Sequence, residues 1–335
     1  MSDSPAAAYD ALPYHHGSVP ETHPARLGAI ARMLGIDAAP PDRCRVLEFG
    51  CAEGMNLLPL AERLPGSTFV GVDFSPVQVR TAEQARVAAG INNARFVCAD
   101  IRTFEPEAGA FDYVIAHGVY SWVPAEVRER LLALCARALA PAGVAYVSYN
   151  VYPAWGMLGG LRAMLRAEMA GAEDPPAHLA RLFPLLQKAF AGDSSPYATW
   201  MREELALMQA KPLALLMHDD LAPDNDPVTF LEFTAHAARH GLSYLAEAHF
   251  PSMPTEHLPP PARGALAELA PDFFSRATFS RSGRQSSLSQ QPAPARHNAG
   301  ETHARSRSDP AMRRRSCICG RWMESSTCRG PNRCA

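Results

Sequence analysis

Short apolar runs alternate with helical periods between Arg43 and Asn150. The runs are rich in Val, Phe and Ile and lie at Cys44–Phe49, Thr68–Val72, Arg95–Cys98, Tyr113–Ala116 and Val144–Ser148. Between them, apolar residues recur at helical spacing, first at Leu57, Leu60, Ala61 and Leu64 and later at Val127, Leu131, Leu134 and Ala138. Strands that alternate with helices in this way predict a parallel sheet. Because the strands are almost continuously apolar, helices are expected to cover both of its faces.

The pattern becomes purely helical after Gly156. Three amphipathic periods follow one another with no strand between them, at Leu158–Leu165, Leu179–Phe190 and Tyr197–Met208. A later helix is expected over Asp226–Gly241, with Gly241 as its C-terminal cap, and a strand over Leu242–Ala248. The run His218-Asp219-Asp220 is expected to form a solvated turn. The chain is therefore predicted to contain a helical second module and a late helix–strand unit.

Apolar periodicity stops after Phe279, where Ser, Arg, Gln, Pro and Gly dominate. Such a segment buries too little surface to offset its ordering entropy. Residues 276–335 are therefore predicted to be a disordered, Arg/Ser-rich tail. The other expected regions are an N-terminal lid segment with a helix (residues 1–42), an α/β core (43–150), and a helical region with the late helix–strand unit (151–275).

Composition narrows the class of protein. The 335 residues are 47% hydrophobic, as in an ordinary globular chain. The net charge of −2 conceals an asymmetry, because eleven arginines and three acids from Ser280 onward give +8 and leave −10 for the first 279 residues. Nucleic acid is therefore an unlikely partner of the core, since phosphate contacts rely on clustered Lys and Arg. The tail is able to bind an anionic surface, but its abrupt loss of pattern favours a segment with no selected role.

The chain carries no sign of a membrane or secretory protein. Its longest uncharged run, Ala138–Leu161, is interrupted by Pro141 and Pro153, and its N-terminus lacks a basic start followed by an apolar stretch. Four of the eight cysteines are scattered through apolar or motif positions, as expected of reduced thiols. The predicted location is the cytoplasm, with no membrane partner. No metal is expected, because the cysteines near the C-terminus, Cys317, Cys319, Cys328 and Cys334, lack paired zinc-knuckle spacing.

The stretch from Arg45 to Asn56 carries the most chemistry. A predicted buried strand ends around Glu48, and the small-residue turn Gly50-Cys51-Ala52-Glu53-Gly54 then leads into a helix. Glycines let the backbone approach a ligand closely, and open α/β sheets bind ligands at the carboxyl ends of their strands. Asp73 closes the next strand, where its carboxylate can accept from both hydroxyls of a ribose.

Glycine spacing separates two cofactors that fit this layout. A dinucleotide loop needs glycines at relative positions 1, 3 and 6, which here are Gly50, Ala52 and Met55. The alternative pattern Glu-x-Gly-x-Gly-x-Gly is met from Glu48 to Gly54, with Ala52 as its one departure. This second pattern resembles the S-adenosylmethionine loop of class I methyltransferases. Phe96–Ile101 and Phe111–Gly118 look like the third-strand and fourth-strand motifs of the same family.

The resemblance implies an α/β fold, a Rossmann-like class I methyltransferase sandwich in which residues 43–150 bind S-adenosylmethionine. The implied cofactor-binding residues follow the first four strands and are Glu48, Gly50, Cys51, Ala52, Gly54, Asn56, Asp73, Phe74, Asp100, Ile101 and His117. In this assignment the glycine turn lines the methionine portion, Asp73 the ribose, and Asp100 with Ile101 the adenine.

More widely, the chain resembles bacterial methyltransferases that carry a predicted methyltransferase regulatory domain. The residues that carry the resemblance are Tyr9-Asp10, Pro13-Tyr14, Thr22-His23-Pro24, Asn56–Ala61, His117–Pro124, Ser148–Trp155 and, for the regulatory part, Phe230–Met253. The match spans about residues 9–275, and family members usually continue with folded sequence where this chain has its tail. The implied function is S-adenosylmethionine-dependent methyl transfer by an enzyme.

His117 and Tyr120 are the candidate catalytic residues, because the fourth strand would deliver them beside the methyl donor. The alternatives are that His117 packs against the adenosine and that Tyr120 packs on a neighbouring helix. Methyl transfer needs mainly alignment and exclusion of water, since the sulfonium already activates the methyl group. Two other functions stay open: a non-catalytic binding or regulatory protein with this fold, and a nicotinamide-dependent reductase, which Met55 disfavours.

A small molecule or a protein side chain is the predicted methyl acceptor. The helices of Gly156–Met217 and the segment Tyr9–Tyr14 are expected to fold over the carboxyl edge of the sheet from two sides. A mouth closed in this way excludes water, and it suits a small molecule or a flexible side chain better than a nucleic-acid duplex.

Overall fold

The computed structural model of the chain describes residue 12 and residues 17–250, 260–269 and 315–319. The chain divides into two compact units, Met1–Ala154 with Asp224–Trp322, and Trp155–Pro223 with Met323–Ala335. The first unit contains a sheet with flanking helices, and the second is built from helices wherever it is described. Within the described ranges, every helix is too short or too polar to cross a lipid bilayer.

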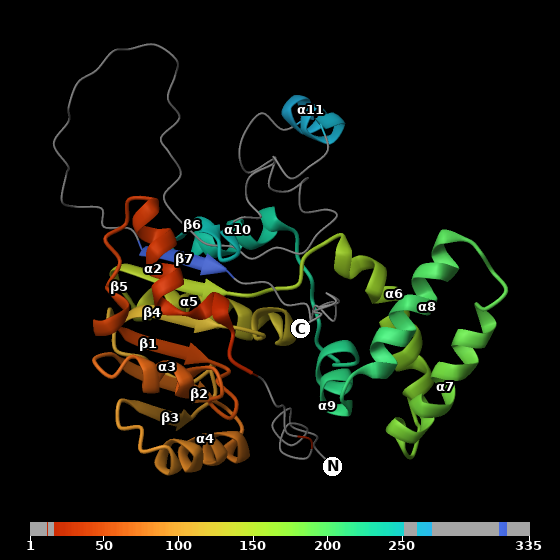
Figure 1. The fold of residues 1–335 in the computed structure, drawn as a ribbon, viewed down its shortest axis with the longest axis horizontal. Coiled ribbons are helices and arrows are strands. Elements are labelled where there is room, and N and C mark those ends of the chain that lie inside the picture. The colour runs from red at the N-terminus through yellow and green to blue at the C-terminus, as the bar shows by residue number, and fades with distance from the viewer. Residues whose placement is uncertain (1–11, 13–16, 251–259, 270–314, 320–335) are drawn as a thin grey trace, which may run out of the picture. The chain divides into compact units, whose positions relative to one another are not determined.

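A seven-stranded sheet with the order β3-β2-β1-β4-β5-β7-β6 forms the centre of the first unit (Figure 1). All of its neighbouring strands pair in parallel. The strands are β1 (Arg45–Phe49), β2 (Thr68–Asp73), β3 (Ala94–Cys98), β4 (Phe111–Ala116), β5 (Leu139–Val147), β6 (Leu242–Glu247) and β7 (Arg315–Cys319). The strand order reverses between β1 and β4, and open α/β sheets bind ligands at the carboxyl ends of the strands that flank such a reversal.

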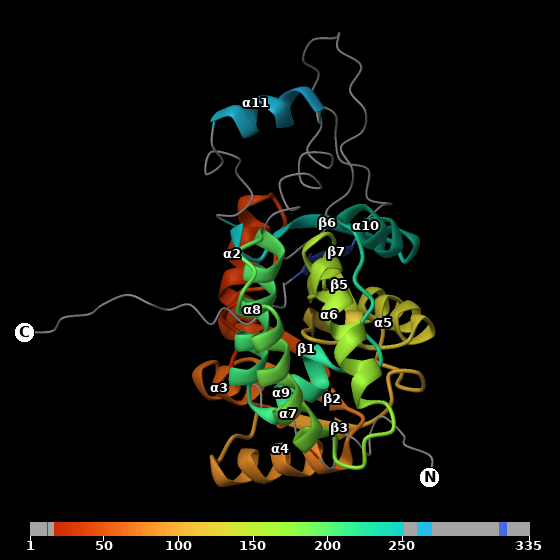
Figure 2. The same cartoon turned by 90° about the vertical axis from the view of Figure 1, so that its right-hand side faces the viewer.

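Helices cover both faces of this sheet, because alternate side chains of each strand point to opposite sides. On one face, Leu47 and Val114 belong to a core shared with α5 (Ala125–Ala138) and α10 (Phe230–Arg239). On the other, Val46 and Ile115 belong to a core shared with α2 (Pro24–Met33), α3 (Leu57–Arg63) and α4 (Pro76–Ala88). Figure 2 shows the sheet between α2 and α3 on one side and α5 and α10 on the other. The predicted Rossmann-like α/β sandwich is confirmed.

Local sequence signals start two of the helices. Ser75 precedes Pro76 at the start of α4, and its hydroxyl accepts from the backbone N–H of Gln78 at 3.1 Å. A reciprocal capping box starts α10, in which the Thr229 hydroxyl accepts from the N–H of Glu232 at 3.2 Å and the Glu232 carboxylate accepts from the N–H of Thr229 at 2.7 Å. Because of this box α10 begins at Phe230, four residues later than the sequence analysis expected.

Short elements complete the first unit. They are the 3₁₀ turns η1 (Pro20–Thr22), η2 (Pro41–Arg43) and η3 (Tyr120–Trp122), and the helix α11 (Pro260–Leu269).

The second unit, drawn in green in Figure 1, has three long helices, as predicted for the stretch after Gly156. Its elements are α6 (Ala154–Met169), α7 (Pro175–Ala189), α8 (Pro196–Ala210), the short α9 (Leu213–Leu215) and the π-helical turn η4 (Leu216–Asp220). Helices α7 and α8 pack against each other. Leu165, Phe183 and Leu205, one from each long helix, are buried in its interior.

The run His218-Asp219-Asp220 is not the solvated turn that the sequence analysis expected, since all three residues are buried within η4. Arg162 of α6 is also buried and donates from Nε to the carbonyl of Asp220 and from Nη2 to the carbonyl of Ala222 at 3.0 Å. Lys211 Nζ donates to Asp220 Oδ2 at 2.7 Å. Paired and hydrogen-bonded charges can be buried, so polarity alone did not show that this run lies inside.

Two predicted boundaries also differ from the structure. The region 151–275 is divided, because α10 and β6 join the first unit while residues 155–223 form the second. Within the predicted disordered tail, Arg315–Cys319 forms β7 between β5 and β6. A strand in that position supplies hydrogen-bond partners to backbone groups of both neighbours. The remainder of 276–335 lies outside the described residues.

Candidate functional site

The turn after β1 approaches the neighbouring strand through its backbone. The N–H of Gly50 donates to the carbonyl of Val72 in β2 at 2.8 Å, and Gly50 has a φ of 70° that favours glycine. A Cβ added at Gly50 would lie 2.6 Å from Cγ2 of Val119, in the loop that follows β4. The turn is therefore packed closely between the ends of β2 and β4.

Asp73, the last residue of β2, connects the turn after β1 to the turn after β2. Its Oδ2 accepts from the backbone N–H of Ala52 at 2.9 Å, and its Oδ1 accepts from the N–H of Ser75 at 2.9 Å. Ala52 has a φ of 45°, in the left-handed region, at the position where the loop pattern calls for glycine. The Asp73 carboxylate thus lies where the turns after β1 and β2 meet.

Glu48 is a buried carboxyl group beneath the turn, with a relative exposure of 3%. Its Oε1 accepts from Nδ2 of Asn56 at 2.8 Å. Its Oε2 is shielded from solvent and has no hydrogen-bond partner among the residues that the structure describes. Burial raises the pKa of Glu48 to about 8, an effect that the hydrogen bond from Asn56 opposes and the charge of Asp73 increases. A buried polar atom of this kind is a candidate contact for a ligand group.

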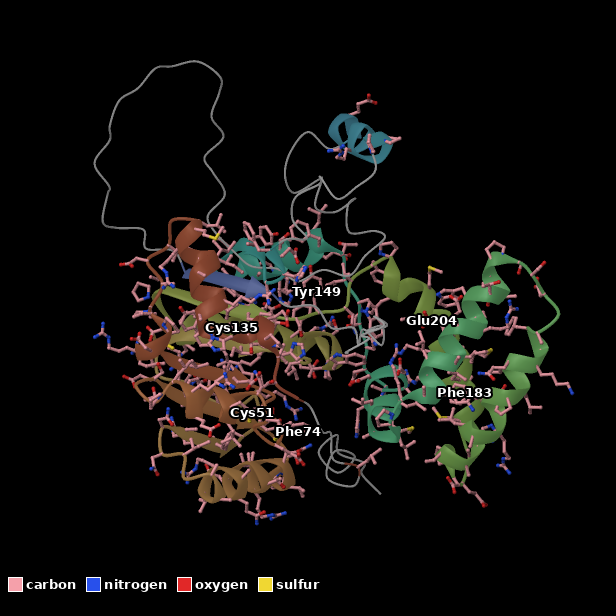
Figure 3. The ribbon with its side chains drawn as sticks, viewed as in Figure 1. Cys51, Phe74, Cys135, Tyr149, Phe183 and Glu204 are labelled. Carbon is pink, nitrogen blue, oxygen red and sulfur yellow. The ribbon has the colours of Figure 1, made fainter. Side chains whose placement is uncertain are left out.

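Cys51 lies beside Glu48 and Asp73, and it too is buried. Burial is the main reason why the pKa of its thiol lies well above the ordinary value. The thiol is therefore neutral, and it lines the turn as a small apolar group rather than as a nucleophile. Figure 3 labels Cys51 and Phe74, which follow β1 and β2 at the carboxyl edge of the sheet.

A segment before the sheet also reaches this site. The N–H of Val19 donates to Oδ1 of Asn56 at 2.9 Å, and Nδ2 of Asn56 donates to the hydroxyl of Thr22 at 3.0 Å. Residues 19–22 are thus connected through Asn56 to Glu48. The sequence analysis placed a lid in residues 1–42 without identifying these contacts, although Thr22 belongs to a motif that carried the family resemblance. The segment Tyr9–Tyr14, apart from Leu12, lies outside the described residues.

The third strand leads to Asp100, whose carboxylate is paired with a neighbouring arginine. Arg102 Nη2 lies 2.6 Å from Asp100 Oδ2, and the backbone N–H of Arg102 donates to Oδ1 at 2.8 Å. These hydrogen bonds hold the pKa of Asp100 below its ordinary value. Ile101 is half-buried against the sheet core, while Phe74 is 37% exposed. The two apolar side chains offer surfaces for a flat ring.

His117 directly follows β4; it is partly exposed, and its Nδ1 lies 3.2 Å from the Tyr146 hydroxyl. The next residue, Gly118, donates its N–H to the Ser148 hydroxyl at 2.7 Å. Both partners lie on β5 or directly after it, so the loop after β4 is anchored to the neighbouring strand. Sequence reasoning missed Tyr146 and Ser148, and only the parallel register of β4 and β5 shows that they face His117 and Gly118.

Tyr120, the second catalytic candidate, is only 2% exposed. Its ring packs edge-on against Phe233 of α10 at 5.1 Å, and its hydroxyl lies 2.7 Å from His236 Nδ1. Tyr149 stacks on the same Phe233 ring at 4.2 Å. This placement favours the packing role for Tyr120 over contact with a substrate.

The residues at the ends of β1 and β2 fit the methionine and ribose of S-adenosylmethionine, the cofactor that the loop pattern implied. The Oε2 of Glu48, which has no hydrogen-bond partner among the described residues, suits an ammonium group. Gly50 has no Cβ, so the turn can pack closely against Val119 of the loop after β4. Asp73 ends β2 and Phe74 follows it, while Asp100 and Ile101 follow β3, the strand beside it. Main-chain hydrogen bonds thus bring most of the predicted residues to one edge of the sheet.

Two protein families match this chain. Residues 46–143 match a family described as a methyltransferase domain, and residues 212–280 match one described as a predicted methyltransferase regulatory domain. The first match extends from β1 into β5, and the second contains α10 and β6.

Relatives and a solved structure come from Rickettsia. The uncharacterized protein RP028 of Rickettsia prowazekii is 31% identical over 241 residues, which are 71% of this chain and 96% of that protein. The uncharacterized protein RP789 of the same organism is 35% identical over 75% of this chain but only 46% of that protein.

The structure of PKMT2 from Rickettsia typhi in complex with AdoHcy superimposes with a TM-score of 0.73 at 29% identity, covering 80% of this chain and 52% of that one. The chain therefore spans about half the length of RP789 and of PKMT2.

Proposed function

Since the chain belongs to the class I S-adenosylmethionine-dependent methyltransferases that carry a predicted methyltransferase regulatory domain, we propose that it catalyses methyl transfer from S-adenosylmethionine to a small molecule or a protein side chain. The observation that carries the proposal is the buried Glu48, which has one oxygen without a hydrogen-bond partner among the described residues and lies beneath the glycine turn after β1. The solved neighbour that holds AdoHcy, the demethylated form of the same cofactor, supports it.

When bound, S-adenosylmethionine supplies a methyl group that its sulfonium already activates. The chain's own residues then have three tasks: to hold the cofactor, to align the acceptor and to exclude water. Glu48 would hold the ammonium group and Asp73 the ribose diol. Val19 and Thr22, through Asn56, keep the segment before α2 against the turn and so limit access of water from that side.

His117 is the candidate for orienting the acceptor or removing a proton from it. Its Nδ1 is close to the Tyr146 hydroxyl, which fixes the plane of the imidazole ring. A general base is needed only if the accepting atom must lose a proton. His117 would therefore act on a hydroxyl, thiol or ammonium acceptor, and a neutral amine would need only alignment.

Charge favours a small molecule or a protein side chain over nucleic acid as the acceptor. The first 279 residues carry a net charge of −10, and phosphate backbones are bound by clustered Lys and Arg. Two relatives with small-molecule names, a trans-aconitate 2-methyltransferase of Variovorax paradoxus and a 2-heptyl-1-hydroxyquinolin-4(1H)-one methyltransferase of Mycobacteroides abscessus, match only 31% and 30% of the chain. These matches support cofactor binding and leave the choice between the two acceptor classes open.

Cofactor binding is tested by calorimetry with AdoHcy on the purified chain. Glu48→Gln keeps the shape of the side chain but cannot form the carboxylate that would pair with the ammonium group of the cofactor, and a hydrogen bond to a charged group contributes about 1.5–3 kcal/mol. We therefore expect the affinity to fall by about 10–100-fold. The matched control is Asp112→Asn. Asp112 pairs with Arg45 near the starts of β4 and β1, at the edge of the sheet opposite to the candidate site. An unchanged affinity in Glu48→Gln would remove Glu48 from the site.

Asp73→Ala tests the ribose contact in the same assay. Leaving the hydroxyls without their acceptor costs about 1–3 kcal/mol of binding free energy. Asp73 also accepts from Ala52 and Ser75, so the melting temperature of the variant is recorded alongside its affinity. Loss of stability without loss of affinity would show that Asp73 only supports the turn.

Methyl transfer itself is tested with S-adenosylmethionine labelled in its methyl group, added with the protein to a cell lysate. The products are fractionated by size before and after nuclease treatment, with Glu48→Gln as the inactive control. We expect label in small-molecule or protein fractions. Label mainly in nuclease-sensitive material would contradict the proposed acceptor class. Binding of AdoHcy with no transfer of label to any fraction would instead indicate a non-catalytic binding protein.

A further inference from the structure

Glu129, His236 and His240 form a cluster of potential metal ligands between α5 and the end of α10. Glu129 lies on α5, and the two histidines lie four residues apart at the end of α10, so both face the same side of that helix. His236 Nε2 is 2.9 Å from one Glu129 oxygen, and His240 Nε2 is 2.8 Å from the other. One ligand atom from each residue lies within 4.8 Å of the others.

The two histidine side chains are held in place and mostly shielded, with exposures of 12% for His236 and 14% for His240. His236 Nδ1 lies 2.7 Å from the Tyr120 hydroxyl, which is itself buried. In the metal-free protein Nε2–H donates to Glu129 at 2.9 Å, and the Tyr120 hydroxyl donates to Nδ1. A bound metal would select the other tautomer, in which Nδ1–H donates to the Tyr120 hydroxyl and Nε2 offers its lone pair to the ion. Metal-bound histidines are oriented in this way by a partner on the second ring nitrogen.

The Nε2 of His240 adds a second observation to this cluster. This atom is shielded from solvent and, despite the nearby carboxylate oxygen, has no hydrogen-bond partner among the residues that the structure describes. An ion bound by both atoms removes the need for an N–H···O bond between them. Zinc takes ligand nitrogens and oxygens at about 2.0–2.2 Å, which places the ligand atoms roughly 3.4 Å apart in a tetrahedron. The two distances from the histidine Nε2 atoms to the Glu129 oxygens, 2.9 and 2.8 Å, would each have to lengthen by about half an ångström to meet this geometry.

We propose that Glu129, His236 and His240 bind a divalent transition metal, with Zn²⁺ the best match to two imidazoles and one carboxylate, and that the ion links α10 to α5. A fourth position is left for water, as in other three-ligand zinc sites. The ion connects the part of the chain that matches the regulatory domain to the part that matches the methyltransferase domain. Through His236 it also fixes Tyr120, three residues beyond His117 in the loop after β4.

Arg239 is the one nearby cation that competes for Glu129, among the residues with described side chains. Its Nη2 lies 3.5 Å from Glu129 Oε2, but its side chain is 61% exposed. The guanidinium is therefore free to move into solvent when a metal binds. Removing it should strengthen metal binding, whereas removing a ligand should abolish it. An Arg239 substitution therefore serves as the control, because it should change the metal affinity in the opposite direction to a ligand substitution.

The test uses the full chain, stripped of metal with a chelator and then titrated with Zn²⁺ by equilibrium dialysis. We expect His240→Gln and Glu129→Gln each to bind one equivalent fewer than wild type. The affinity of the site should fall at least about 100-fold, because changes to outer partners alone cost about 10–100-fold. Arg239→Gln should bind the full complement with equal or higher affinity. Metal-free melting temperatures close to wild type show that the variants fold.

Cobalt separates this site from any cysteine site elsewhere in the chain. With Co²⁺, a site of two histidines and a carboxylate gives visible d–d bands without sulfur-to-cobalt charge transfer, and those bands should disappear in His240→Gln. Tyr120→Phe, which removes only the outer partner, should weaken the site by about 10-fold or more. Equal metal stoichiometry and affinity in wild type, His240→Gln and Glu129→Gln would overturn the proposal. If either variant is unfolded without metal, the other variant tests the proposal. Loss of its d–d bands supports the site, and unchanged bands contradict it.

Discussion

Ala52 adopts a left-handed φ of 45° in the turn that contacts Asp73. For a residue with a Cβ this conformation costs roughly 1–2 kcal/mol. The strain persists because the Ala52 N–H is bound to Oδ2 of Asp73, and the glycines on either side, Gly50 and Gly54, also have positive φ values. The one departure from the loop pattern therefore lies at a position where the backbone would favour glycine.

Ala52→Gly should be as stable as wild type, or more stable by up to about 1.5 kcal/mol. Relief of strain gains roughly 1–2 kcal/mol, against about 0.4–1 kcal/mol lost to the greater freedom of glycine in the unfolded chain. The matched control is Ala88→Gly at the end of α4, where glycine should cost up to about 1 kcal/mol. Urea unfolding measures both. If Ala52→Gly lowered the free energy of unfolding as much as Ala88→Gly, Ala52 would not be strained in the wild-type protein.

Glu48 should make the stability of the ligand-free protein depend on pH. Its pKa is raised from an ordinary value of 4.5 to about 8 by burial, so between these values the folded state keeps a proton that the unfolded state has released. Folding stability therefore falls as the pH rises through this window and levels off above about 8.

Glu48→Gln has no proton to lose, so its melting temperature relative to wild type should increase steadily from pH 5 to pH 8.5. Thermal melts at intervals across this range measure the difference, with Asp112→Asn as a control that removes an acid away from the site and keeps Glu48. A constant difference between Glu48→Gln and wild type would show that Glu48 is ionised throughout.

At the scale of elements, α10 illustrates how local signals and packing combine. Thr229 and Glu232 start the helix through their capping box, and Phe230 and Phe233 bury its apolar side against the sheet core. Its last turn and cap carry His236 and His240 toward Glu129 of α5. The residue at which α10 begins therefore determines which of its side chains face α5.

Thr229→Ala should lower the free energy of unfolding by about 0.5–2 kcal/mol, because it leaves the N–H of Glu232 without its side-chain partner. Thr234 is the control, since its hydroxyl only donates back to the carbonyl of Leu231 within the same helix. Thr234→Ala should change stability by less than about 0.5 kcal/mol. Denaturant titration distinguishes the two variants. Equal effects would mean that the capping box contributes little in solution.

At the scale of the whole molecule, the two units use different means of stabilisation. The first unit has a sheet with an apolar core on each face. The second buries a polar network between α6 and η4, in which Arg162 donates to the carbonyls of Asp220 and Ala222. Burial lowers the pKa of Arg162 only to about 10, so this residue stays charged at neutral pH.

Arg162→Ala should destabilise the helical unit by about 3 kcal/mol or more, because it removes a buried partner from Asp220 and Ala222. Arg166→Ala is the matched control one turn later on α6, since Arg166 also donates to a carbonyl, that of Pro223, but at an exposed position. Hydrogen exchange should rise in α6–α8 of the first variant and little in the second. Similar exchange in both would assign no special role to the buried charge.

The sequence by itself determined the elements whose cause is local. The apolar runs predicted β1 to β5, and the helical periods predicted α5, α6, α7, α8 and α10 but not α4. The acids and glycines at the strand ends indicated Glu48, Gly50 and Asp73 as one site, which stays a prediction. These could be predicted because side-chain period, turn chemistry and the parallel order of strands follow from neighbouring residues.

The tertiary structure alone decided the contacts between residues far apart in the chain. It buried Asp220 beside Arg162, inserted β7 between β5 and β6, placed Tyr120 against His236, and brought Glu129 within reach of two histidines 107 and 111 positions later. Such pairings depend on which faces of packed helices and strands meet. The periodicity of a single segment cannot predict these contacts, because the free energy of each contact depends on both of its residues.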